Sequence, residues 1–281
     1  MKPSVHPENA WPTISDPANQ NRAFTLTELL VVLAIVALLA MTLLPALAGV
    51  KDKGGRAQCA ANLRQIGMAS MVYANENNTW LPLCWLDPTG GDSSHGLNVL
   101  NEVHYTRYVW ITSPTSPTPP YPVPTNATPA NYFQNLGYLY HAGLAGNGNI
   151  FYCPAQSGTN YLGADSYLPL LTTDASGTVR SSYDYNPRAV IGASSRYFRQ
   201  YQKTTQLEPR KLFAVDDLEL GLNPTTFAHI RERGWNVLFT DGGVQFSRSG
   251  QVYGLLRNLT SGSSIYYPDA NQYCDYLERD H

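Results

Sequence analysis

An uninterrupted apolar run dominates the N-terminal part of the chain. No charged residue occurs between Leu29 and Val50. A helix rises about 1.5 Å per residue, so a helix over this run is long enough to cross a hydrocarbon core of about 30 Å. The sequence therefore predicts a membrane-spanning helix that begins near Thr25 or Thr27, since either residue can cap it. Pro45 removes one backbone hydrogen bond and predicts a kink.

The pattern becomes amphipathic after Arg56. Residues on one helical stripe recur at spacings of four and three: Cys59, Leu63, Ile66, Ser70 and Tyr73. The polar residues Asn62, Arg64 and Gln65 fall off this stripe. The spacing predicts that the second half of the helix, residues 56–78, packs one face against a globular domain.

In the C-terminal part the hydrophobic residues no longer follow a helical spacing, and four short hydrophobic runs predict β-strands. They are Ile150–Cys153, Lys211–Val215, Asn236–Thr240 and Gly243–Ser247, with Asp241 and Gly242 as a tight turn. The proline-dense segment 112–130 favours an extended loop, and the apolar segments beside it are too short for a second domain. The predicted fold class is α+β: a long N-terminal helix, 24–78, followed by a globular domain, 79–281, with an antiparallel sheet and long loops.

A motif lies where the apolar run begins. Arg22 to Glu28 reads RAFTLTE, which resembles the prepilin cleavage and methylation signature of type IV pilins and type II secretion pseudopilins. The resemblance implies that a prepilin peptidase cuts between Ala23 and Phe24, removes the leader 1–23 and leaves Phe24 to be methylated. One departure is Ala23, where the family usually has glycine.

The same resemblance assigns roles within the apolar run. Glu28 becomes the fifth mature residue, where the family has its glutamate, and Pro45 becomes the twenty-second, where many members have a proline. In a filament core, the Glu28 carboxylate would neutralise the amino terminus of a neighbouring subunit, a pairing that low dielectric strengthens. The alternative is an ordinary signal anchor in which Glu28 only marks the membrane interface.

Further fragments resemble a pseudopilin-like family that is abundant in planctomycetes. They are QCAANLRQIGMASMVYANENNTWLP after the apolar run, Leu136 to Ala155, and Asn236 to Phe246. In that family nine residues usually separate a histidine from an Asp-Gly pair. Here eleven residues separate His229 from Asp241, so a shared role of this histidine does not carry over.

The composition of the chain argues against one class of binding partner. The net charge is −2 and only 14% of the residues are charged, which argues against nucleic acid. The four cysteines, Cys59, Cys84, Cys153 and Cys274, are too widely spaced for a local metal-binding knuckle. In an oxidising compartment they allow up to two disulfides with three full pairings, and the tail cysteine Cys274 is a candidate partner. A buried free thiol is the alternative for Cys59.

Candidate chemistry is sparse. Asp216, Asp217 and Glu219 follow a predicted strand, and with Asp241 they offer oxygen ligands suited to calcium. No calcium-type loop spacing is present, so a solvated acidic turn is the favoured interpretation. No nucleophile elbow, zinc-protease motif or phosphate loop occurs, and the scattered histidines, His229 included, are expected to be loop or surface residues rather than catalytic bases. We therefore expect no enzyme activity and no cofactor.

Two functions remain. The first is a structural subunit of a pilus-like filament or secretion pseudopilus, made as an inner-membrane precursor whose domain is periplasmic. Its partners would be other pilin-type subunits, the prepilin peptidase and an inner-membrane assembly platform. The second is a membrane-anchored module whose aromatic-rich domain captures a polysaccharide or another surface ligand. Filament assembly depends on Glu28, whereas an anchored receptor tolerates its loss.

Overall fold

The structure, a computed structural model, describes seven ranges of the chain: 25–82, 105–107, 135–156, 179–191, 197–218, 227–258 and 267–280. Within helix residues 43–49 only the backbone is described. The chain divides into two compact units, Met1–Gly49 and Val50–His281. The predicted leader 1–23 and proline-rich loop 112–130 lie outside the described residues and stay predictions.

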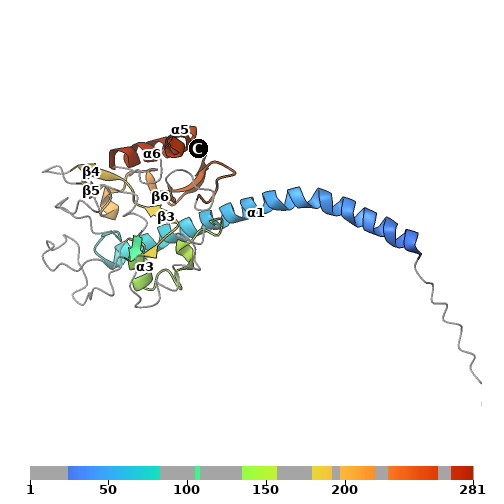
Figure 1. Cartoon of the computed structure of the whole chain (residues 1–281). Helices are drawn as coiled ribbons and strands as arrows, with labels where there is room; N and C mark the ends of the chain where they lie inside the picture. Colours follow the sequence, from blue (N-terminus) through green and yellow to red (C-terminus); the bar gives the residue numbers. More distant parts are fainter. Residues whose placement is uncertain are drawn as a thin grey trace, which may run out of the picture. The chain divides into compact units, whose positions relative to one another are not determined.

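The longest element is helix α1, Leu26–Glu76, which contributes to both units (Figure 1). Its ends lie within two residues of the predicted ones. Thr25 caps the first turn: the Glu28 backbone N–H donates to the Thr25 hydroxyl, and the Thr25 N–H donates to the Glu28 carboxylate. This reciprocal capping box satisfies two backbone donors that a helix N-terminus otherwise leaves unpaired.

The second unit is built on a four-stranded antiparallel sheet in the order β3-β6-β7-β8. These strands are Tyr183–Tyr185, Leu212–Asp216, Trp235–Phe239 and Val244–Ser247. Two smaller sheets pair β1 (Tyr105–Arg107) with β2 (Val179–Arg180), and β4 (Ala189–Ile191) with β5 (Tyr197–Arg199). Helices α3 (Gly137–His141), α5 (Gly250–Asn258) and α6 (Tyr267–Arg279) and the 3₁₀ turns η2 (Asn149–Phe151) and η4 (Thr204–Gln206) complete the described elements. The predicted α+β class is confirmed.

Three of the four predicted strands are confirmed as β6, β7 and β8. The turn between the last two is also as predicted, with Gly242 at φ 83° and the Gly243 N–H donating to the Asp241 carboxylate. The strand predicted at Ile150–Cys153 is wrong. Gly148 has a positive φ, and the N–H groups of Phe151 and Tyr152 bond three residues back, which forms the 3₁₀ turn η2 instead.

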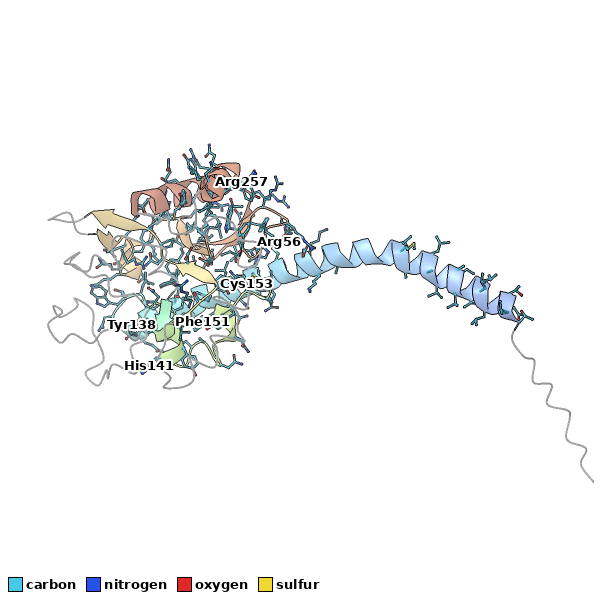
Figure 2. All side chains as sticks on the ribbon, viewed as in Figure 1. Arg56, Tyr138, His141, Phe151, Cys153 and Arg257 are labelled. Carbon is cyan, nitrogen blue, oxygen red and sulfur yellow. A yellow bond between two sulfur atoms is a disulfide. The ribbon has the colours of Figure 1, made fainter. Side chains whose placement is uncertain are left out.

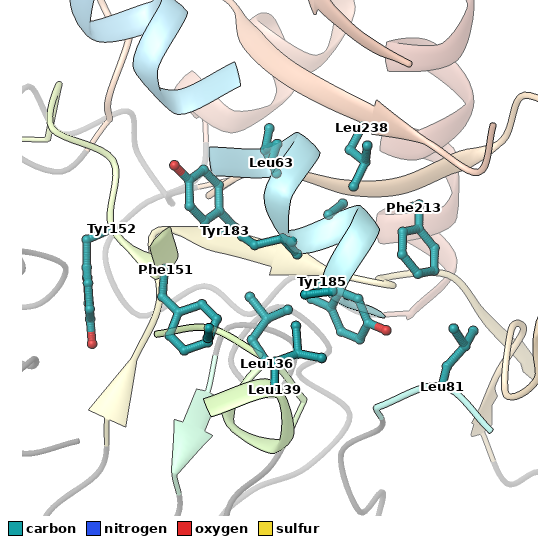
Figure 3. Packing of buried hydrophobic residues seen from close by; sticks show 14 of the residues in the cluster. Leu63, Leu81, Leu136, Leu139, Phe151, Tyr152, Tyr183, Tyr185, Phe213 and Leu238 are labelled. Carbon is teal, nitrogen blue, oxygen red and sulfur yellow. The ribbon is translucent and has the colours of Figure 1, made fainter. Parts of the chain in front are cut away.

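The four-stranded sheet has a hydrophobic cluster on each face. Along β7, Trp235, Val237 and Phe239 pack with buried residues of α5 and α6. Leu238 packs on the other face with buried residues of α1 and α3 (Figure 3). This alternation follows from the two-residue period of a strand. α1 lies close to β7 at Gly67, where an added Cβ would sit 3.1 Å from the Leu238 Cδ2 atom. The second half of α1 is therefore part of the globular core.

The predicted stripe on α1 is largely buried. Cys59, Leu63, Ile66 and Ser70 are fully buried and Tyr73 is half-buried. Asn62, which was expected off the stripe, is also buried, and its side-chain amide donates to the Tyr152 carbonyl and the Tyr183 hydroxyl. The amide is buried at little cost because both N–H groups have acceptors.

Candidate functional site

The described part of the N-terminal motif begins at Thr25, so Ala23 and Phe24 lie outside it and the cleavage site stays a prediction. Glu28 is engaged within its own chain: the Thr25 N–H and hydroxyl both donate to one carboxylate oxygen, at 2.9 and 2.8 Å. These two hydrogen bonds hold the Glu28 carboxylate against the first turn of α1. The Glu28 side chain therefore caps the start of α1 within its own chain.

The apolar residues that follow are exposed. Between Thr25 and Thr42 every side chain of α1 is exposed, including Leu26 at 79% and Met41 at 72% (Figure 2). A contiguous exposed apolar surface of this kind marks a site of membrane or protein contact. Within the described residues, no helix meets the length and hydropathy needed to span a bilayer. The roles of Glu28 and Pro45 in assembly stay predictions.

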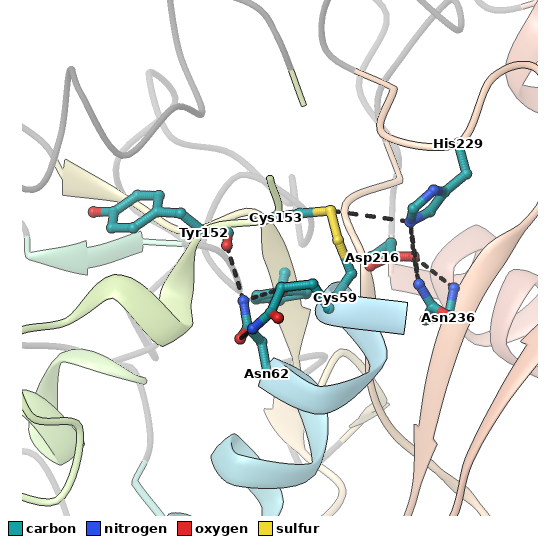
Figure 4. The surroundings of a disulfide bond; sticks show 9 residues. Cys59, Asn62, Tyr152, Cys153, Asp216, His229 and Asn236 are labelled. Carbon is teal, nitrogen blue, oxygen red and sulfur yellow. Dashed lines mark hydrogen bonds and ion pairs between the residues drawn. A yellow bond between two sulfur atoms is a disulfide. The ribbon is translucent and has the colours of Figure 1, made fainter. Parts of the chain in front are cut away.

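A disulfide in the second unit ties α1 to the segment after η2. Cys59 and Cys153 are bonded, with their Cα atoms 5.1 Å apart and 94 residues apart in sequence (Figure 4). Cys274 is a free thiol, buried on α6, so its expected pairing is wrong. Burial raises the pKa of this thiol to about 12. Cys84 lies outside the described residues.

A row of polar and aromatic side chains crosses the sheet beneath the disulfide. The strand registers align Tyr183, Asp216, Asn236 and Phe246, one residue from each strand. Tyr183 and Leu238 belong to the cluster around α1, so the row lies on the α1 face. Helix α1 contacts both ends of this row. Asn62 donates a hydrogen bond to the Tyr183 hydroxyl at one end, and the Arg56 guanidinium lies 4.6 Å from the Phe246 ring centre at the other.

His229 joins the middle of this row to the disulfide. Its Nε2 atom lies 3.9 Å from the Cys153 sulfur, 3.3 Å from Asp216 Oδ2 and 3.1 Å from the Asn236 side-chain nitrogen (Figure 4). The imidazole packs edge-on against Phe246, with ring centres 5.8 Å apart. His229 lies in a turn rather than in a helix or strand, and it is buried, with only 4% of its surface exposed. One nitrogen thus faces a sulfur, a carboxylate and an amide.

The Asp216 carboxylate is almost fully buried, and its two oxygens differ. Oδ2 accepts hydrogen bonds from the backbone and side-chain N–H groups of Asn236, while no donor among the described residues reaches Oδ1. A buried carboxylate with an unsatisfied oxygen is costly unless a cation or donor compensates it. We define Cys59, Cys153, Asp216 and His229 as the Cys-His-Asp cluster. Their ligand-type atoms all lie within 4.8 Å of one another.

A shallow groove lies between α1 and the edge strand β8. Its cavity volume is about 510 Å³, and Asn236 lies in its wall. Arg56, Arg64 and Arg248 line it, with the Phe246 ring between the first and last of them. Arg56 is paired with Glu232 at 2.9 Å. Three arginines therefore give the groove a positive lining, and Asn236 both lines it and contacts Asp216 and His229 of the cluster.

Two of the four candidate calcium ligands, Asp216 and Asp241, lie apart. Asp216 lies next to Asn236 at the start of β7. Asp241 is exposed beyond the other end of that strand. It follows Asn236 by five residues, which corresponds to about 16 Å at the rise of a β-strand. Asp217 is buried, with its N–H donating to the Ser182 carbonyl. Glu219 lies outside the described residues. Of the four, only Asp216 belongs to the cluster.

Sequence reasoning missed His229 and Asn236 as site residues. The pattern that located β7 contained a signal, because Asn236 is a polar residue on a strand whose other four residues are apolar. The cysteine that follows the aromatic pair Phe151 and Tyr152 was a second signal. Neither revealed that these residues meet, because the cluster draws on four separate segments of the chain.

Comparison with known proteins identifies the N-terminal region. Residues 18–44 match the family model described as the prokaryotic N-terminal methylation motif. This is the prepilin-type signal of type IV pilins and pseudopilins, so the chain carries the N-terminal signal of a pilin-type precursor. No curated protein and no solved structure matches the chain.

Proposed function

We propose that this chain is a structural subunit of a type IV pilus-like filament or a type II secretion pseudopilus. One observation carries the proposal. The methylation motif leads into the first half of α1, and the described side chains of that half, residues 25–42, are all exposed and mainly apolar. Neighbouring copies of the same helix, or related pilin-type subunits, would bury that surface after it leaves the membrane. The second unit would then be displayed outside the filament core.

Processing and assembly follow the order implied by the motif. The prepilin peptidase removes residues 1–23, Phe24 is methylated, and the inner-membrane assembly platform adds the subunit to the polymer. Glu28 neutralises the amino terminus of a neighbouring Phe24, which sets the axial position of one subunit relative to the next. Support for this role comes from the methylation motif matched at residues 18–44, which includes Glu28.

A charge test separates pairing from capping. Glu28→Ala removes both the charge and the capping box, whereas Glu28→Gln keeps an oxygen that accepts from the Thr25 N–H and removes only the charge. Glu76→Gln is the matched control, since Glu76 is an exposed glutamate at the other end of α1. Sheared surface material is examined by electron microscopy, and the subunit N-terminus is identified by mass spectrometry.

We expect filaments with methylated Phe24 in the parent and in Glu76→Gln, and none in either Glu28 variant. Normal filaments in Glu28→Gln would show that capping, not charge, is the role of this residue. A parent chain that stays uncut and monomeric in the membrane, with the Glu28 variants unchanged, would overturn the filament proposal. The membrane-anchored binding module would then be the better account.

A further inference from the structure

We infer that the Cys-His-Asp cluster is a zinc site in the reduced protein, and that Zn²⁺ and the Cys59–Cys153 disulfide are alternative states of the same centre. Each state holds α1 to the segment after η2 and to the sheet. The inference is independent of filament assembly, because all four ligands belong to the second unit.

The four ligand-type atoms lie within 4.8 Å of one another, so movements of about 1 Å bring them to the spacing of a single tetrahedral ion. With metal–ligand bonds of about 2.0 to 2.3 Å, the ligand atoms of a zinc site lie about 3.3 to 3.8 Å apart. The His229 nitrogen is 3.3 Å from Asp216 Oδ2 and 3.9 Å from the Cys153 sulfur. Only the two sulfurs are closer than a zinc site requires, since they are bonded to each other. Reduction lets them separate by side-chain rotation.

The donor set selects the metal. Two thiolates, one imidazole and one carboxylate suit zinc, which accepts sulfur, nitrogen and oxygen ligands in closed four-coordinate sites. Calcium and magnesium require oxygen ligands and would reject the sulfurs. All four side chains are at most 4% exposed, so a bound ion would be shielded from water as in a structural site.

Two features outside the four ligands support the assignment. Asn236 donates two hydrogen bonds to Asp216 Oδ2 and so fixes the orientation of that carboxylate, which is the usual task of residues around a metal site. Asp216 Oδ1, by contrast, has no donor among the described residues although it is buried. A cation at the centre compensates the buried negative charge that Asn236 alone leaves in place.

Conversion from the disulfide to the zinc-bound state takes two steps. A dithiol reductant passes two electrons and two protons to the disulfide and is itself oxidised to a disulfide, which leaves Cys59 and Cys153 as thiols. Zn²⁺ then forms two zinc–sulfur bonds and releases the two thiol protons. A newly synthesised chain starts in the dithiol state, in which zinc holds the fold together. A disulfide-bearing oxidant then accepts two electrons from the two thiolates and takes up two protons to become a dithiol, while Cys59 and Cys153 form their bond and Zn²⁺ is released.

The test uses the full-length chain in mild detergent with Cys84→Ser and Cys274→Ala, so that only two thiols remain. After reduction with a phosphine, exposure to Zn²⁺ and desalting, bound zinc is counted by elemental analysis. Co²⁺ is added in a parallel sample to report thiolate ligation through its charge-transfer absorption. His229→Gln removes one ligand, and His141→Gln is the matched control at an exposed histidine on α3 (Figure 2).

We expect one zinc per chain and a thiolate-to-cobalt band in the reduced parent and in His141→Gln, and neither in the oxidised chain or in His229→Gln. Asn236→Ala should weaken zinc binding by about 10 to 100-fold while leaving the thiolate signature in place. A folded, reduced chain without stoichiometric zinc would overturn the inference, as would equal zinc in His229→Gln.

A reduced chain that unfolds without metal still decides the question. It is then refolded from denaturant under reducing conditions with and without Zn²⁺. Recovery of the folded state only with one equivalent of zinc supports the site, and failure to recover it with zinc refutes the site.

Discussion

Breaking the Cys59–Cys153 bond in the absence of metal should strongly destabilise the second unit. The bond closes a loop whose ends are 94 residues apart in sequence. In the chain-entropy model, a loop of this length restricts the unfolded state by about 4.7 kcal/mol at 25 °C, and measured disulfide contributions are typically about 2–4 kcal/mol. We therefore expect reduction to lower the free energy of unfolding by about 2–5 kcal/mol.

The assay is urea unfolding of the full-length chain in detergent, with a chelator present to remove zinc. Intrinsic fluorescence reports the transition, because Trp235 is fully buried between the sheet and the C-terminal helices. With a denaturant slope of up to about 3 kcal/mol per molar, the expected loss lowers the midpoint by roughly 1 to 2 M. Cys59→Ala/Cys153→Ala is the control, and reductant should leave its midpoint unchanged.

Two results would refute this reasoning. A midpoint that moves by less than about 0.3 M on reduction of the parent would mean that the loop is already restricted in the unfolded chain, or that the bond is strained when folded. An equal response of the double variant to reductant would show that the effect does not come from this disulfide.

Three further predictions concern packing and charge in the second unit. Gly67→Val should cost about 1–3 kcal/mol by overpacking α1 against β7, with Gly67→Ala much milder in the same thermal melts. Cys274 should resist alkylation at pH 8 until urea unfolds the chain, as peptide mass spectrometry will show. Its folded pKa of about 12 exceeds the ordinary 9.0, so stability falls as pH rises above 9. Glu278→Gln should cost about 3 kcal/mol in urea titrations because it breaks a buried pair with Arg188, whereas Asp275→Asn, at a more exposed partner of the same arginine, should cost under about 1 kcal/mol.

Local pattern was enough to predict the long helix and three strands of the main sheet. The long helix, the strands β6 to β8 and the Asp-Gly turn all follow from the period of apolar residues and from turn chemistry. The strand predicted at Ile150–Cys153 failed because a short apolar run carries no period, and the positive φ of Gly148 sets the backbone of this segment instead.

Burial of polar residues was harder to predict, because it depends on distant partners. Asn62 is polar and lies beside the apolar stripe, so its burial is explained only by its two acceptors, Tyr152 and Tyr183, which lie about ninety or more positions away in sequence. The same holds for His229, which is buried because a sulfur, a carboxylate and an amide surround it.

The cluster itself depends on strand register. A shift in the ladder between Leu212 and Ala214 changes which residues of β6 face α1, and Asp216 lies on that face only because of it. Without the shift, strict alternation from Leu212 would turn Asp216 toward the C-terminal helices, away from Asn236 and the disulfide. One irregularity in the ladder therefore determines whether a buried carboxylate meets two cysteines and a histidine, and sequence period alone does not reveal such an irregularity.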